Sequence, residues 1–104
     1  MKLWIDDVRP APVGYLWCKS TRDALRKIVL EHFNEIELID LDHDAGDYVK
    51  DGGDYIEVLK ELERLTRRHK LDLSYIKFRL HSANPVGVQN MRAIIEANGW
   101  VEIR

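Results

Sequence analysis

The chain has 104 residues, of which 45% are hydrophobic and 33% charged, and its formal net charge is −2. This composition excludes a disordered chain, and the near-neutral charge excludes a generally basic nucleic-acid binder. The lone Cys18 excludes an intrachain disulfide and a multi-cysteine zinc site. No apolar run reaches the ~18–20 residues of a membrane span. We therefore expect one domain over residues 1–104, located in the cytoplasm and without membrane contact.

Strand-like and helix-like segments alternate along the chain, which predicts an α/β domain with a mainly parallel sheet. We expect strands over residues 2–6 and 15–19, with an extended loop between them. A helix then begins after Ser20, whose hydroxyl can cap it, and its apolar stripe continues as far as Phe33. Cys18 alternates into the predicted core.

The remaining predicted elements are, in chain order, a strand over 36–41, an Asp-rich loop, a helix over about 55–68, a strand over 75–81, a helix over 84–98 and a strand over 100–104. Asp54 is expected to cap the second helix, with Glu57 completing a capping box. Asn84 followed by Pro85 is typical of the start of a helix, and Gly99 is typical of a helix end.

The strand order that we expect is 2-1-3-4-5, with parallel neighbours. Residues 7–14 can return along the first strand without a helix, because Pro10 and Pro12 favour an extended path. The three helical crossovers then step in one direction, and right-handed crossovers place all three helices on one face of the sheet. The opposite face is expected to be bare.

Alternation within the strands sorts the side chains onto two faces. The face under the helices is predicted to hold Leu3, Ile5, Leu16, Cys18, Ile76, Phe78, Leu80, Val101 and Ile103. The bare face is predicted to hold Lys2, Trp4, Tyr15, Trp17, Tyr75, Lys77, Arg79, Trp100, Glu102 and Arg104. An aromatic and cationic face fits a dimer interface, a docking face or a stacking platform for single-stranded nucleic acid. We favour a homodimer through Trp4, Trp17 and Trp100.

Polar residues follow three of the predicted strands, and these strands are neighbours in the expected order. They are Asp6 and Asp7 after the first strand, Asp42, His43 and Asp44 after the third, and His81, Ser82 and Asn84 after the fourth. In open parallel sheets, ligands bind beyond the carboxyl ends of the strands. The sequence therefore predicts one pocket built from three distant segments.

The residue types in this predicted pocket favour metal-assisted phosphate chemistry. The carboxylates of Asp6, Asp7, Asp42 and Asp44 are hard oxygen ligands that suit Mg²⁺ or Mn²⁺. The backbone from Ser82 to Gly87 opens the third helix and can receive a phosphate, and His81 beside it can donate or accept a proton.

Arg9 either clamps a phosphate or covers the loop beside Pro10, and Asn84 is also a plain helix cap. His43 is a candidate contact to the substrate. Asp40 shares the face of Asp42, and whether it supports the site or is exposed stays open.

Three motifs carry a resemblance to a known family. They are Asp6-Asp-Val-Arg-Pro10, Leu41-Asp-His-Asp-Ala-Gly46 and His81-Ser-Ala-Asn-Pro-Val-Gly87, followed by Asn90-Met91. With the βα order, they resemble a compact family of receiver-like domains named for processing cyclic phosphates, related to response-regulator receivers. The resemblance covers nearly the whole chain. It implies a receiver or flavodoxin-like fold that lacks the first and last receiver helices.

The resemblance also implies a function and site roles. It implies a bacterial or phage protein that processes cyclic nucleotide phosphates, such as RNA 2′,3′-cyclic ends in RNA repair. Asp6 and Asp7 would correspond to the acidic metal pair, Asp42 to the phospho-accepting aspartate, and His81 or Ser82 to the switch residue. No lysine ends the last strand, which departs from signalling receivers.

Three hypotheses follow. The first is a Mg²⁺- or Mn²⁺-dependent phosphoesterase that opens a cyclic phosphate on a nucleotide or RNA end, with Asp42 and His81 in catalysis and Arg9, His43, Ser82, Asn84 and Gly87 at the phosphate. The second is a receiver or adaptor module that is phosphorylated on Asp42. The third is a non-catalytic binder of a nucleotide or nucleic acid.

Overall fold

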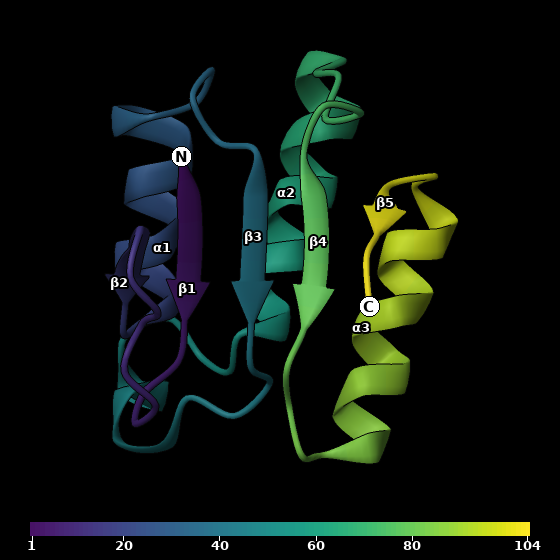
Figure 1. The fold of residues 1–104 in the computed structure, drawn as a ribbon. Helices are drawn as coiled ribbons and strands as arrows, with labels where there is room; N and C mark the ends of the chain where they lie inside the picture. Colours follow the sequence, from purple (N-terminus) through teal and green to yellow (C-terminus); the bar gives the residue numbers. More distant parts are fainter.

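The computed structural model describes residues 1–104 as a parallel five-stranded sheet with helices behind it (Figure 1). The strands are β1 (Lys2–Ile5), β2 (Tyr15–Cys18), β3 (Leu38–Leu41), β4 (Lys77–Leu80) and β5 (Val101–Glu102). The helices are α1 (Thr21–Arg26), which continues as a π-helical turn η1 (Lys27–Glu31), then a 3₁₀ turn η2 (Gly46–Lys50), α2 (Ile56–His69) and α3 (Pro85–Ala97). No helix is both long and apolar enough to cross a membrane.

The predicted topology is confirmed. The strands lie in the order β2-β1-β3-β4-β5, and every neighbouring pair is parallel. The loop over residues 7–14 replaces a helix between β1 and β2, as its prolines predicted. The strands are shorter than predicted, and β3 and β4 each begin two residues later than the apolar pattern indicated.

Two of the predicted helix caps are confirmed and one is wrong. The Ser20 hydroxyl accepts a hydrogen bond from Asp23 N at 3.0 Å, and the Asn84 side chain accepts one from Gly87 N at 3.0 Å. Asp54, by contrast, does not cap α2. Its carboxylate accepts from Ala45 N at 2.9 Å instead, so it fastens the Asp-rich loop.

A single apolar core lies between the sheet and the three helices. Leu3 and Ile5 of β1 and Phe78 of β4 share one strand face, and they join side chains from α1, α2 and α3 in the core. This places the helices on one face, as predicted. Cys18 is fully buried there, also as predicted.

The predicted face assignment of β5 is wrong. Trp100 is only 8% exposed and stacks on Phe78 with ring centroids 5.2 Å apart, so it belongs to the core. Glu102 follows it onto the helix side, where it binds Arg92 of α3. Val101 consequently points to the opposite face. Since side chains alternate along a strand, burial of the Trp100 indole places each β5 side chain on the face opposite to the predicted one.

The face without helices is called here the open face, and it is less bare than predicted. It carries Trp4 and Tyr15, whose rings pack edge to face at 6.0 Å. The loop over residues 7–14 passes in front of β2 (Figure 1), and the Trp4 indole N–H donates to Arg9 O at 2.8 Å. Trp4 and Trp17 are therefore half-buried, and a homodimer through this face stays a prediction.

Candidate functional site

The candidate site lies where β1, β3 and β4 end. All three strands run in the same direction and are neighbours, so their carboxyl ends meet at one edge of the sheet, the lower edge in Figure 1. The backbone N–H of Asp42 donates to Ile5 O, and that of His81 donates to Leu41 O, which carries the sheet's hydrogen bonding into the site. The three segments predicted to converge do converge.

Asp6, Asp7 and Asp42 form what we call the carboxylate cluster. One oxygen from each lies within 4.8 Å of the others. Asp6 is buried, whereas Asp7 and Asp42 are half-buried. Burial raises the pKa of Asp7, and the neighbouring charges of Asp6 and Asp42 raise it further. Crowded carboxylates of this kind repel one another unless a cation lies between them.

Asp6 is the most constrained member of the cluster. Its Oδ1 accepts from the backbone N–H of Val8 at 2.9 Å and of Arg9 at 3.0 Å, and its Oδ2 lies 2.8 Å from Nε2 of His81. Burial acts to raise its pKa, but these hydrogen bonds outweigh burial and lower it. Asp6 is thus a fixed anion, and Asp7 and Asp42 hold the more accessible oxygens of the cluster.

His81 lies between two carboxylates. Its Nδ1 is 2.7 Å from Oδ1 of Asp40, opposite the contact of Nε2 with Asp6. Two carboxylate neighbours favour the form of the ring in which both nitrogens carry protons, the imidazolium. Burial acts to lower the pKa of His81, but the two hydrogen bonds outweigh it and raise the pKa.

The ring of His81 also stacks flat on Trp4, with centroids 3.8 Å apart and planes within 5°. Trp4 thereby shields the ion pairs from solvent. Asp40, whose role the sequence left open, is 2% exposed and supports the site from beneath. The sequence signal for this role was the position of Asp40 two residues before Asp42, on the same face of the strand.

Arg9 reaches the same edge of the sheet. Its Nη1 donates to His81 O at 3.0 Å, while its own carbonyl accepts from the Trp4 indole. The loop after β1 is thus tied to both β1 and the end of β4. A role for the Arg9 guanidinium in holding a phosphate stays a prediction.

Asp44 lies in a second group, separate from the carboxylate cluster. Its Oδ1 is 2.8 Å from Nδ1 of His43, and these two residues gather with Asp54. The His43 ring packs against α3 so closely that a Cβ on Gly87 would lie 2.5 Å from it. Of the four carboxylates predicted to bind one metal, Asp6, Asp7 and Asp42 therefore lie together, and Asp44 lies in the neighbouring group.

The start of α3 closes the other side of the site. The Ser82 hydroxyl accepts from Asn84 N at 3.1 Å, and Asn84 in turn accepts from Gly87 N. The Asn84 amide also donates weakly to Asp44, at 3.4 Å. These side chains organise the first turn of the helix, and their contact with a phosphate stays a prediction.

Gly46 is a site residue that sequence reasoning missed. It has a φ of +55°, and a Cβ there would lie 2.2 Å from Oδ2 of Asp7. Only glycine leaves that carboxylate room. The available signal was a glycine three residues after His43, next to a dense run of aspartates.

The carboxylate cluster fits a hard divalent cation. It offers three oxygen donors of the type that Mg²⁺ prefers, and the space beside Asp7 is kept free by the missing side chain of Gly46. The cluster lines none of the four hollows in the protein surface.

A comparison with protein-family models identifies the relationship. The family described as Cyclic-phosphate processing Receiver domain matches residues 1–97. No curated protein and no solved structure matches the chain.

Proposed function

The chain belongs to the family of cyclic-phosphate processing receiver domains, and on this premise we propose that it hydrolyses a cyclic phosphate on a nucleotide or an RNA end with the help of a divalent cation. The observation that carries this proposal is the convergence of Asp6, Asp7 and Asp42 within 4.8 Å at the carboxyl edge of a parallel sheet. The family name supports a cyclic phosphate as the substrate class.

Asp7 and Asp42 are the residues that would hold the cation, with Asp6 fixed beside them. A Mg²⁺ or Mn²⁺ ion bound there would polarise a phosphoryl oxygen and lower the pKa of a water molecule. The closeness of the three carboxylates supports this assignment, because a cation would relieve the repulsion among them.

The reaction itself is a hydrolysis. A water oxygen bonds to phosphorus, one ring P–O bond breaks, and the released ribose oxygen takes a proton. The Arg9 guanidinium donates to His81 O at the end of β4, and it would supply positive charge for the phosphate. With both ring nitrogens bound to carboxylates, His81 fits a positioning role better than that of a free acid or base.

Turnover of a panel of cyclic phosphates tests the proposal. The panel contains 2′,3′-cyclic nucleotides, 3′,5′-cyclic nucleotides and an RNA with a 2′,3′-cyclic end, each with Mg²⁺, with Mn²⁺ or with a chelator. We expect turnover of at least one substrate, lost with the chelator and reduced by about 100-fold or more in Asp7→Asn and Asp42→Asn. Asp47→Asn, an exposed carboxylate of the same loop, is the matched control. Absence of metal-dependent turnover across the panel would refute the proposal.

A further inference from the structure

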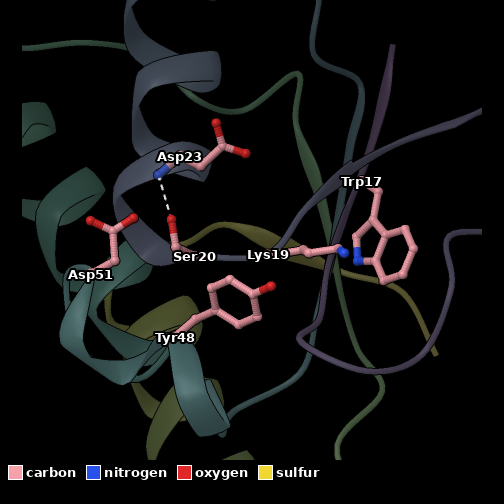
Figure 2. A pocket seen from close by; sticks show the side chains of 6 residues that line it. All are labelled: Trp17, Lys19, Ser20, Asp23, Tyr48 and Asp51. Carbon is pink, nitrogen blue, oxygen red and sulfur yellow. Dashed lines mark hydrogen bonds between the residues drawn. The ribbon is translucent and has the colours of Figure 1, made fainter.

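A hollow of about 340 Å³ opens at the carboxyl end of β2, outside the site described above. We call it the aromatic hollow, and Figure 2 shows its lining residues, which are Trp17, Lys19, Ser20, Asp23, Tyr48 and Asp51. The residues come from two segments, the end of β2 with the start of α1 on one side and the turn η2 on the other. Its volume is in the range of small-ligand pockets.

Hydrogen bonds hold the two sides of the aromatic hollow together. The buried Tyr55 hydroxyl donates to Lys19 O at 2.6 Å, and Arg22 N donates to Asp51 O at 3.1 Å. The Thr21 hydroxyl donates to Gly53 O at 3.0 Å. The hollow is therefore preformed, which reduces the entropy cost of binding a ligand there.

The aromatic hollow is attached to the carboxylate cluster on both sides. The Trp17 indole N–H donates to Asp6 O at 2.8 Å. On the other side, Gly46 touches Asp7, and Tyr48 follows Gly46 by two residues. Two residues span at most roughly 7 Å, so the tyrosine backbone lies that close to the glycine at Asp7. The aromatic hollow and the carboxylate cluster are thus joined through neighbouring residues.

The lining chemistry decides what binds in the aromatic hollow. Tyr48 offers a flat aromatic surface, whereas Lys19 Nζ lies over the Trp17 ring, 4.5 Å from its centre. Asp23 and Asp51 each pair with an arginine through Oδ1, at 2.7 and 3.4 Å, and Oδ2 has no such partner.

A nucleobase matches all of these groups. Its flat face stacks on aromatic rings, its ring nitrogens accept from lysine, and its amino groups donate to carboxylates. We propose that the aromatic hollow binds the base of the nucleotide whose cyclic phosphate meets the carboxylate cluster. This inference rests on the proposed function for the placement of the phosphate.

Equilibrium binding by calorimetry, with a chelator present to block turnover, tests the inference with adenosine 2′,3′-cyclic phosphate, base-free methyl riboside 2′,3′-cyclic phosphate and adenosine as probes. Wild-type protein is expected to bind the nucleotide about tenfold or more tightly than the base-free ester, because stacking of one base contributes on that scale. Tyr48→Ala should remove most of this preference, and Tyr48→Phe should keep it. Tyr75→Ala removes an exposed tyrosine remote from the hollow and should also keep it.

Equal affinity for the two esters, or an unchanged preference in Tyr48→Ala, would overturn the inference. Adenosine has no phosphate, so its binding tests the aromatic hollow independently of the proposed hydrolysis. Tyr48-dependent adenosine binding without turnover of any cyclic phosphate supports the aromatic hollow and refutes the hydrolase. Turnover without base preference and without adenosine binding supports the hydrolase and refutes base binding in the aromatic hollow.

Discussion

Asp40 and His81 form a buried ion pair across β3 and β4, with Oδ1 of Asp40 2.7 Å from Nδ1 of His81. The side chains are 3% and 12% exposed, and Trp4 covers the imidazole. Through its other nitrogen His81 holds Asp6, so Asp40 acts on the carboxylate cluster without touching it.

Asp40→Asn is expected to destabilise the protein by about 3 kcal/mol, since it keeps the shape of the side chain and removes one charge of a buried pair. The midpoint of guanidinium unfolding measures this effect. Asp47→Asn, which removes an exposed carboxylate, is the control and should leave the midpoint nearly unchanged. Equal midpoints for the two variants would contradict the prediction.

Gly46→Ala is expected to weaken Mn²⁺ binding by about tenfold or more, because the new Cβ would displace Oδ2 of Asp7. The measurement is a calorimetric titration with the metal alone. Gly14→Ala is a matched control: its φ is +89°, which gives similar backbone strain, yet nothing lies within 4 Å of the new Cβ. If both variants bind Mn²⁺ like the wild-type protein, the glycine has no role in shaping the cluster.

Glu102 gives a pH-dependent contribution to stability. It receives two hydrogen bonds from Arg92, at 2.8 and 2.7 Å, and these lower its pKa below the usual 4.5. A carboxyl group whose pKa is lowered on folding stabilises the protein above its unfolded pKa. This stabilisation is lost as the pH falls through the lowered, folded value.

Glu102→Gln should therefore reduce the free energy of unfolding by about 1–2 kcal/mol at pH 7. The difference from the wild-type protein should shrink below about pH 4.5. Denaturant unfolding at several pH values measures it, and Asp47→Asn, which removes an exposed carboxylate, is the control. A difference that stays constant down to pH 3 would argue against the ion pair.

Cys18 is expected to be unreactive in the folded protein. It is fully buried, and burial raises its pKa to about 12, so only about one thiol in ten thousand is ionised at pH 8. An aromatic disulfide reagent should label it only after denaturation. The same reagent in guanidinium chloride gives the full signal as a control, and rapid labelling of the native protein would be inconsistent with this burial.

The helix layer could be predicted once the strand order 2-1-3-4-5 was taken as the premise, because periodicity marks the strands and helices and right-handed crossovers fix the face that the helices cover. The face of β5 could not, because a strand of two residues carries almost no alternation and the bulk of Trp100 decides it. Asp54 has the sequence signature of a cap, but its partner Ala45 lies nine residues away.

The convergence of Asp6, Asp7 and Asp42 also followed from topology alone. The placement of His81 between Asp40 and Asp6 did not follow from topology, because it depends on which residues of neighbouring strands face each other. Likewise, the aromatic hollow joins Trp17 to Tyr48 from separate segments, and only the turn η2, which the apolar pattern does not reveal, brings them together.

The distance between Asp7 and Asp42 along the chain has a consequence for the order of folding events. Asp7 and Asp42 are 35 positions apart in the chain, and they meet only after β3 has aligned beside β1. Contacts of such long range form late on the folding pathway. A bound cation would then lengthen the lifetime of the folded state by slowing unfolding, while the rate of folding would hardly change.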